Sequence, residues 1–222
     1  MPLDTLLDNL NKTLPETPFV RPGGSLLMMV GLPGTGKSSV VNALQSMMPH
    51  VIIATDEVRA SIRQSPDYTP SEMMLVYEIC YRLIERRLNE GQRVVFDGSN
   101  LIAARRNHLH HLARKCGSPM AICYIQASQE IIQQRLKARA LRGHSHQDKS
   151  DADWAVYKWM VEAQEPVSKP HLIVDTTESK PNELAQKLFN YWQHIEKNAA
   201  SDPDLQSPGW VHKLSQFHGL GR

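Results

Sequence analysis

The stretch Gly31-Leu32-Pro33-Gly34-Thr35-Gly36-Lys37-Ser38 constrains the fold of this 222-residue chain more than any other feature. Its spacing is G-x-x-x-x-G-K-[ST], and the apolar run Leu26–Val30 comes directly before it. Directly after it, Ser39–Met48 has the composition of a helix that ends at Pro49. A strand, a glycine loop and a helix in this order predict an α/β fold in which the loop lies at the edge of a parallel sheet.

This loop predicts a site for a nucleoside triphosphate. Its glycines let successive backbone N–H groups turn inward, and the following helix adds free N–H groups and the positive end of its dipole. Lys37 is expected near the β and γ phosphates, and the hydroxyl of Ser38 is expected on Mg²⁺. We therefore expect residues 31–38, together with Ser39, to bind ATP and Mg²⁺.

Composition limits the classes of partner and compartment. The formal net charge is only +2, so no strong global field attracts nucleic acid or a membrane surface. The cysteines, Cys80, Cys116 and Cys123, are odd in number and lack C-x-x-C spacing, which argues against a disulfide framework or a zinc site. No apolar stretch approaches the roughly 18 residues of a transmembrane helix, and the first residues do not resemble a signal peptide. We expect a cytoplasmic protein without a membrane partner.

Apolar runs separated by helical stretches predict the architecture. The runs are continuous rather than alternating, as in strands that are buried on both faces. They predict five parallel strands, at Leu26–Val30, Val51–Ala54, Arg93–Phe96, Met120–Ile125 and Leu172–Val174. Helices are expected at Ser39–Met48, Ser71–Glu90, Leu101–Cys116, Ser128–Leu141, Asp151–Glu165 and Pro181–Lys197, with Ser71 and Ser128 as N-caps. The expected fold is a three-layer α/β/α sandwich.

The chain divides into a central domain and two short extensions. Residues 1–24 combine leucines at helical spacing with a proline-rich linker, and residues 25–198 form the predicted domain. The tail, residues 199–222, is polar and is expected to be loosely ordered. We expect the N-terminal helix to pack on its own domain, with binding of a partner as the alternative. Nothing in the sequence indicates a protein partner, and self-association stays open.

Two charged residues follow the second predicted strand. Asp56 comes at its carboxyl end, the edge where the glycine loop lies and where open α/β sheets bind ligands. A carboxylate there can accept the proton of an attacking hydroxyl or hold a magnesium-bound water. Arg59 comes one helical turn later and is suited to bind an anionic group of the acceptor. In the alternative interpretation, Asp56 caps a helix and Arg59 is solvated.

A second acid, Asp97, ends the third predicted strand and is expected at the same sheet edge. It is suited either to pair with Arg59 or to act near Mg²⁺, as the acids of other P-loop proteins do. In the alternative interpretation, Asp97 and Gly98 simply form the turn after a strand.

An arginine stripe predicts a lid at about residues 135–152. Arg135, Arg139 and Arg142 share one face of a predicted helix, and the segment 143–150 after them has the composition of a mobile loop. Such a lid closes over phosphates and adds positive charge in the transition state. An exposed basic helix face is the alternative, and a metal site at His144, His146 and Asp148 is a weaker one.

Together these motifs resemble the kinase domain of polynucleotide 5′-hydroxyl kinases and their P-loop relatives, such as adenylylsulfate kinases and zeta toxins. The resemblance covers roughly residues 25–176. It rests on Gly31–Ser38, on Asp56 with Arg59, on Asp97-Gly98-Ser99-Asn100 followed by Arg105-Arg106, and on Arg135 with Arg139.

The resemblance implies a role for each matched residue. Asp56 would be the general base, Arg59 would contact the 3′-phosphate of an acceptor nucleotide, and Asp97 would support Arg59. Arg135 and Arg139 would be lid arginines on the γ-phosphate. The acceptor site would consist of Asp56, Arg59, Asp97 and Asn100, and the metal site of Ser38 and Asp97.

These features predict an ATP-dependent phosphotransferase. The expected acceptor is a 5′-hydroxyl of a nucleic acid, as the resemblance implies. A small-molecule alcohol is the first alternative, because related P-loop kinases of metabolites also place an aspartate after the second strand. The second alternative is an ATP-binding switch that hydrolyses ATP without an acceptor.

Overall fold

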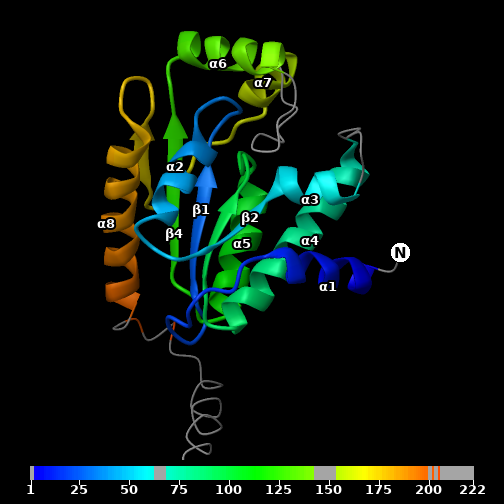
Figure 1. Cartoon of the computed structure of the whole chain (residues 1–222), viewed down its shortest axis with the longest axis vertical. Coiled ribbons are helices and arrows are strands. Elements are labelled where there is room, and N and C mark those ends of the chain that lie inside the picture. The colour runs from blue at the N-terminus through cyan, green and yellow to red at the C-terminus, as the bar shows by residue number, and fades with distance from the viewer. Residues whose placement is uncertain (1–2, 63–68, 143–153, 200–201, 203–204, 206–222) are drawn as a thin grey trace, which may run out of the picture.

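A parallel sheet lies at the centre of the computed structural model, which describes residues 3–62, 69–142, 154–199, 202 and 205. The strand order is β2-β3-β1-β4-β5, and every neighbouring pair is parallel. Helices cover both faces, so the expected three-layer α/β fold is confirmed (Figure 1). The strands are β1 (Ser25–Val30), β2 (Val51–Ala54), β3 (Arg93–Asp97), β4 (Met120–Gln126) and β5 (Leu172–Asp175).

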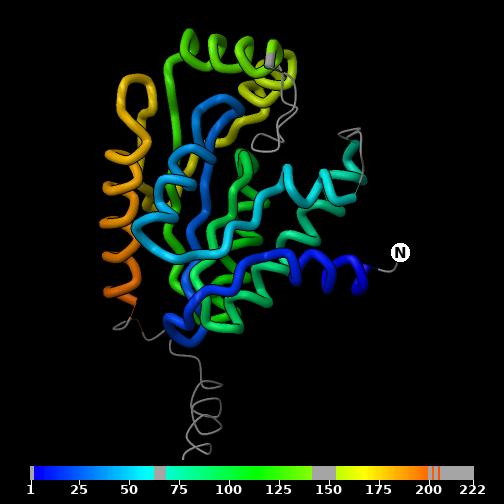
Figure 2. Tube along the Cα trace, viewed as in Figure 1, coloured from blue at the N-terminus to red at the C-terminus, as the bar shows by residue number. Residues whose placement is uncertain are grey.

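The helices form two layers and a cap at the carboxyl end of the sheet. Helices α4 and α5 pack on one face, and α2 and α8 pack on the other (Figure 2). Helices α6 and α7 lie together beyond the strand ends. The bounds are α1 Leu3–Thr13, α2 Lys37–Gln45, α3 Thr55–Ile62, α4 Pro70–Asn89, α5 Ala103–Lys115, α6 Gln129–Arg142, α7 Trp154–Glu162 and α8 Pro181–Ala199.

Register places the predicted site residues at one edge. Ala54 of β2 pairs with Asp97 of β3, and Met28 of β1 pairs with Phe96 of β3. The chain segments that leave β1, β2 and β3 therefore start side by side at the carboxyl ends of these strands. The glycine loop and Asp56 belong to these segments, and Asp97 is the last residue of β3, as the sequence predicted.

Some helix boundaries differ from the expectation. Helix α4 begins at Pro70 with Thr69 as its N-cap, so the prediction of Ser71 was wrong. The Thr69 hydroxyl accepts a hydrogen bond from the Glu72 backbone N–H at 3.3 Å, and Pro70 suits a first position that needs no N–H donor. Ser128 does cap α6, because its hydroxyl accepts from the N–H of Ile131 at 3.4 Å.

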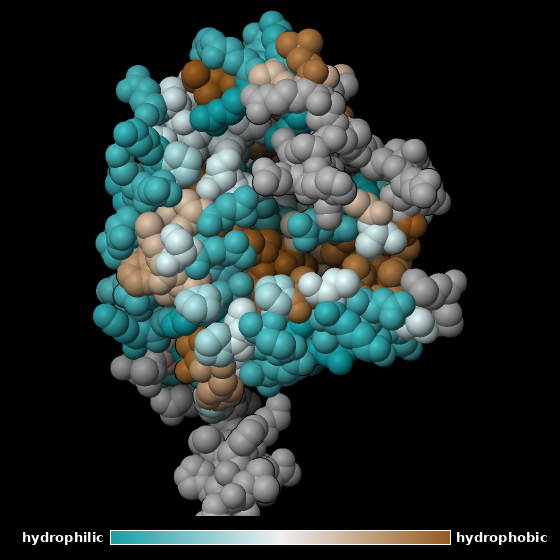
Figure 3. Space-filling model, viewed as in Figure 1, coloured by the Kyte–Doolittle hydropathy of each residue, from teal (hydrophilic) through white to brown (hydrophobic). Residues whose placement is uncertain are grey.

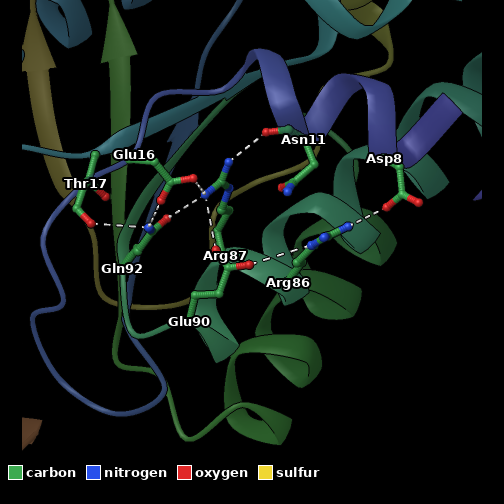
Figure 4. A network of polar contacts seen from close by, with 8 residues as sticks. All are labelled: Asp8, Asn11, Glu16, Thr17, Arg86, Arg87, Glu90 and Gln92. Carbon is green, nitrogen blue, oxygen red and sulfur yellow. Dashed lines mark hydrogen bonds and ion pairs between the residues drawn. The ribbon is translucent and has the colours of Figure 1, made fainter. Parts of the chain in front are cut away.

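Helix α1 packs on its own domain, as expected. Its leucines lie against the core of the α4 face, and its outer side is polar (Figure 3). A network of polar contacts joins the end of α1 and the segment after it to Arg87 and Gln92 (Figure 4). There the guanidinium of Arg87 donates to the carbonyl of Asn11 at 2.8 Å and to Glu16 at 3.3 Å. Gln92 donates to the carbonyl of Thr17 at 3.2 Å.

Several predictions fall outside the described residues. These are the lid segment 143–152 with His144, His146 and Asp148, and most of the tail 199–222. Among the helices that the structure describes, none is long and apolar enough to cross a membrane. The three cysteines are buried and are not joined by disulfides.

Candidate active site

The glycine loop folds tightly against its neighbours at the carboxyl end of β1. The N–H of Gly31 donates to the carbonyl of Ser99 at 3.0 Å, which ties the loop to the segment after β3. A Cβ atom at Gly31 would lie 2.4 Å from the carbonyl oxygen of Ile125, so no larger residue fits there. Gly36 adopts φ 90° and leads directly into α2, which begins at Lys37. The first N–H groups of α2 therefore border the loop, as phosphate binding requires.

Lys37 lies across this loop. Its Nζ donates to the carbonyls of Gly31 and Leu32, each at 3.0 Å. Burial lowers the pKa of Lys37, while the nearby carboxylates of Asp97 and Asp56 raise it and Arg139 lowers it further. The electrostatic neighbours of Lys37 thus include both predicted acids and one arginine of the predicted lid.

Asp97 turns toward the loop and contacts Ser38. The Ser38 hydroxyl donates to Oδ2 of Asp97 at 2.7 Å. Alternation along β3 explains this direction: Val95 and Asp97 face the α2 layer, whereas Phe96 faces the α4 layer. Burial raises the pKa of Asp97, against the opposing effects of Lys37 and Ser38. Asp97 thus contacts Ser38, the residue expected on Mg²⁺, and its role near a metal stays a prediction.

The hydroxyl of Ser38 and the carboxylate of Asp97 suit Mg²⁺, which prefers oxygen ligands and keeps several waters or phosphates. No group of three or more His, Cys, Asp or Glu side chains that could hold a metal ion occurs within the described part of the chain. A metal at this point would therefore depend on these two side chains together with oxygens of the bound nucleotide.

Asp56 belongs to a chain of three charged residues. Nη1 of Arg59 donates to Oδ1 of Asp56 at 2.8 Å, and Nε of the same guanidinium donates to Glu72 at 2.9 Å. The Asp56 side chain is 37 % exposed, whereas those of Arg59 and Glu72 are 8 % and 3 % exposed. The exposed carboxylate of Asp56 thus binds the buried guanidinium of Arg59, which in turn binds the buried carboxylate of Glu72 on α4.

Glu72 is a site residue that the sequence reasoning missed. The pattern Thr69-Pro70-Ser71-Glu72 signals a helix start, which would have placed Glu72 in the first turn of α4. It carries no information about which arginine the side chain meets, because that contact depends on how α3 packs against α4.

Asn100 is buried beneath the loop. Its side-chain amide donates to the carbonyl of Met29 at 2.7 Å, and only 1 % of the residue is exposed. The backbone of Asn100 adopts φ 48°, a conformation that asparagine tolerates better than most residues. In this structure Asn100 supports the end of β1, and its contact with a substrate stays a prediction.

Helix α6 brings Arg135 over the glycine loop. Its guanidinium donates to the carbonyl of Gly34 at 3.3 Å and to the hydroxyl and carbonyl of Thr176, each at 2.8 Å. The Thr176 hydroxyl in turn donates to the carbonyl of Thr35 at 2.6 Å. Thr176, which follows β5, therefore joins the loop to α6, and sequence reasoning gave it no role. Arg139 lies one helical turn beyond Arg135 on α6, on the side of Lys37.

A family model described as an AAA domain matches residues 26–167, more than half of the chain. The chain belongs to this AAA domain family. The matched region begins in β1 and extends past α7, so it contains the loop, Asp56, Asp97 and the described part of α6.

Individual proteins are similar to this chain in sequence or in fold. A thymidylate kinase of Legionella pneumophila is 28 % identical over 148 residues, which cover 52 % of this chain and 70 % of that protein. A putative kinase from Chloroflexus aurantiacus superposes with a TM-score of 0.62 at 17 % identity, covering 76 % and 98 % of the two chains. The APS kinase of Mycobacterium tuberculosis, in complex with AMPPNP and APS, gives a TM-score of 0.59 at 15 % identity, covering 78 % and 99 %. The fold is that of the P-loop kinases.

Proposed function

We propose that this protein transfers the γ-phosphate of ATP to a hydroxyl group, with Asp56 as the general base. The observation that carries the proposal is the exposed carboxylate of Asp56, held by Arg59 at 2.8 Å on the sheet edge that carries the phosphate-binding loop. The APS kinase complex with AMPPNP supports ATP as the donor. Buried cysteines that form no disulfide fit a reducing, cytoplasmic environment.

The residues of the loop hold and neutralise the donor. Backbone N–H groups of the loop and of the first turn of α2 bind the phosphates, and Lys37 places its charge beside them. Ser38 and Asp97 would hold Mg²⁺, which would neutralise negative charge on the phosphates. Arg135 and Arg139 approach from α6, where they stabilise the charge that develops on the transferred group.

Asp56 acts on the acceptor. Its carboxylate accepts a hydrogen bond from the attacking hydroxyl, aligns it with the γ-phosphorus and takes its proton as the new O–P bond forms and the bond to ADP breaks. Arg59 is a positioning residue in this proposal, because two of its donors already bind carboxylates and the residue is 6 % exposed.

We propose a small-molecule alcohol as the acceptor. The predicted contact of Arg59 with a nucleotide 3′-phosphate would require a guanidinium that instead lies buried between Asp56 and Glu72. The thymidylate kinase and the APS kinase among the relatives are named for small substrates. A nucleic-acid 5′-hydroxyl is the second candidate, and it rests on the resemblance of the Asp56, Arg59 and Asp97 motifs to polynucleotide kinases.

The test is transfer from γ-labelled ATP with Mg²⁺ to a panel of small alcohols and 5′-hydroxyl oligonucleotides. We expect at least one small alcohol to be labelled. Asp56→Asn should lower kcat by about 10²- to 10⁴-fold while leaving ATP binding unchanged. Glu57→Gln is the matched control, since Glu57 is the exposed neighbour of Asp56 on α3.

The other outcomes separate the alternatives. Labelling of oligonucleotides alone would establish the second candidate. ATP hydrolysis that no acceptor changes would indicate a switch protein instead. Normal transfer by Asp56→Asn would contradict the assignment of the base.

A further inference from the structure

A guanidinium lies over an aromatic ring on the α4 side of the sheet. Arg105 is in the first turn of α5, and its Cζ lies 4.0 Å from the ring centroid of Tyr77 on α4. Tyr77 packs edge-on against Phe96 of β3, with ring centroids 6.0 Å apart. Tyr77 with Arg105 over its ring, called the platform below, therefore packs on Phe96, the residue that precedes Asp97 in the chain.

Stacking leaves the donors of Arg105 available. The cation–π contact uses the face of the guanidinium, whereas its five N–H groups lie in the plane and point outward. Across the described residues, Arg105 makes no ion pair and its N–H groups donate to no protein oxygen. The side chain is also partly exposed.

Arg106, the next residue, has a structural role that Arg105 does not share. It is 7 % exposed, and its guanidinium donates to the backbone carbonyls of Asn100, Leu101, Glu165 and Pro166. Arg106 joins the segment after β3 to the segment after α7. Arg105 makes no such hydrogen bonds to backbone carbonyls of the described residues, although it lies one position earlier on the same helix.

The other cations at this edge are already engaged with protein groups. Arg59 binds two carboxylates, and Arg135 binds three oxygens of Gly34 and Thr176. The N-terminus of α5 is also occupied, because the carboxylate of Glu165 accepts from the N–H of Ala103. Within the described part of the chain, the N–H groups of Arg105 therefore differ from those of Arg59, Arg106 and Arg135, because they donate to no protein oxygen.

The platform belongs to the same segments as the general base. Tyr77 lies five residues after Glu72 on α4, and Glu72 binds the arginine that holds Asp56. Ile53, three residues before Asp56, pairs with Phe96 beneath the Tyr77 ring. Figure 1 shows the start of α5 and the helices α3 and α4 on the same side of β1.

We propose that Arg105, held on Tyr77, binds an anionic group of the acceptor, which is a phosphate, sulfate or carboxylate. This inference rests on the proposed kinase function and specifies its substrate class as an anionic alcohol. A guanidinium fixed by stacking loses less freedom on binding and offers two parallel N–H donors to two oxygens of the anion.

Direct binding is tested with inorganic sulfate as the probe. The full chain is first saturated with Mg²⁺ and AMPPNP so that the loop is occupied, and sulfate, phosphate or acetate is then titrated by calorimetry. We expect the wild type to bind at least one of these anions, and Arg105→Gln to weaken binding by about tenfold or more. Arg114→Gln, in the last turn of the same helix, is the control and should bind as the wild type does.

Kinetics with matched acceptors provides the second test. The pairs are gluconate with glucose, thymidine monophosphate with thymidine, and adenylylsulfate with adenosine. For any pair that is labelled, Arg105→Gln should raise KM for the anionic member by about tenfold with little change in kcat, and Arg105→Lys should restore part of the loss.

The outcomes distinguish this inference from the proposed function. Failure of the wild type to bind any of the anions, or equal binding by wild type and Arg105→Gln, would overturn the Arg105 subsite. An equal kinetic loss for neutral and anionic members would overturn it as well. If the wild type labels no acceptor at all, the kinase proposal fails, and the sulfate titration still decides whether Arg105 binds anions.

Discussion

Arg59 and Glu72 show how a buried ion pair can direct a reactive carboxylate. A buried pair contributes little net stability, because desolvation of both groups offsets their attraction. Its geometry is nevertheless fixed, since Arg59 donates to Glu72 and Asp56 from two different nitrogens, at 2.9 and 2.8 Å. The position of the Asp56 carboxylate is therefore set by packing between α3 and α4 rather than by its own rotamer preference.

Glu72→Gln should weaken the support that Arg59 gives to the proposed base, Asp56. The amide keeps the shape of the side chain but removes the charge that anchors Arg59, so the Asp56 carboxylate becomes less well positioned. We expect kcat to fall by about 10- to 100-fold with KM for ATP unchanged. Steady-state kinetics together with the pH profile of kcat measures this effect, because a shifted profile reports on the base and not merely on folding.

Glu78→Gln is the control for that experiment. Glu78 lies on the exposed side of the same helix and pairs with Arg82 at 2.7 Å. Its replacement should leave kcat and the pH profile unchanged. An unchanged kcat in Glu72→Gln, or an equal loss in both variants, would contradict a positioning role for Glu72.

At the scale of elements, strands were more predictable than helix starts. Each strand contains a continuous apolar run, even β5, where Ile173 is 58 % exposed, so hydrophobicity located all five within one residue of their bounds. Helix starts depend on single capping residues. Thr69 and Ser71 are both acceptable caps, and the position of Pro70 decided between them.

The site was predictable where it depends on strand ends and not where it depends on packing. Lys37 and Asp56 follow β1 and β2, and Asp97 ends β3; the carboxyl ends of these strands must meet in a parallel sheet. Glu72 and Thr176 act through contacts with Arg59 and with the loop that span 13 and 141 residues. No local pattern encodes such contacts, so only the assembled fold shows them.

The attachment of α1 to α4 yields a prediction at this scale. Arg87 is 1 % exposed and binds the carbonyl of Asn11 at the end of α1. Arg87→Met should lower the free energy of unfolding by about 2 to 3 kcal/mol, because the variant leaves buried acceptors unpaired. Arg86→Met, which removes only exposed pairs with Asp8 and Glu90, should cost about 0 to 0.5 kcal/mol. Urea denaturation of both variants measures the difference, and equal losses would contradict the structural role of Arg87.

At the scale of the whole molecule, the sheet separates the two halves of the proposed reaction. Asp97 faces α2 and the loop proposed to hold the donor, while Phe96 faces α4 and the platform of Tyr77. Adjacent residues of one strand thus serve opposite faces, and the donor and acceptor meet only beyond the strand ends. Displacement of either helix layer relative to β3 would misalign the two halves, which makes global packing part of the catalytic geometry.

The pH dependence of global stability tests the packing of the α2 and α8 layer. His50 is 2 % exposed, lies against Trp192 of α8 at 6.1 Å between ring centroids, and contacts the carbonyl of Met48. Burial lowers the pKa of His50 below its usual value of 6.5, with a further lowering by Arg93 and an opposing effect of the Met48 carbonyl. The unfolded chain therefore binds this proton more readily than the folded protein does. The stabilisation is fully present above pH 6.5 and is lost as the pH falls from there toward the lowered pKa.

We expect the Tm of the wild type, followed by calorimetry from about pH 8 to about pH 5, to fall more steeply than that of His50→Asn. The pKa of His110 is lowered too, but His110 is present in both proteins, so the difference in slope reports on His50 alone. A difference in Tm that stays constant across this range would show that His50 does not couple protonation to unfolding.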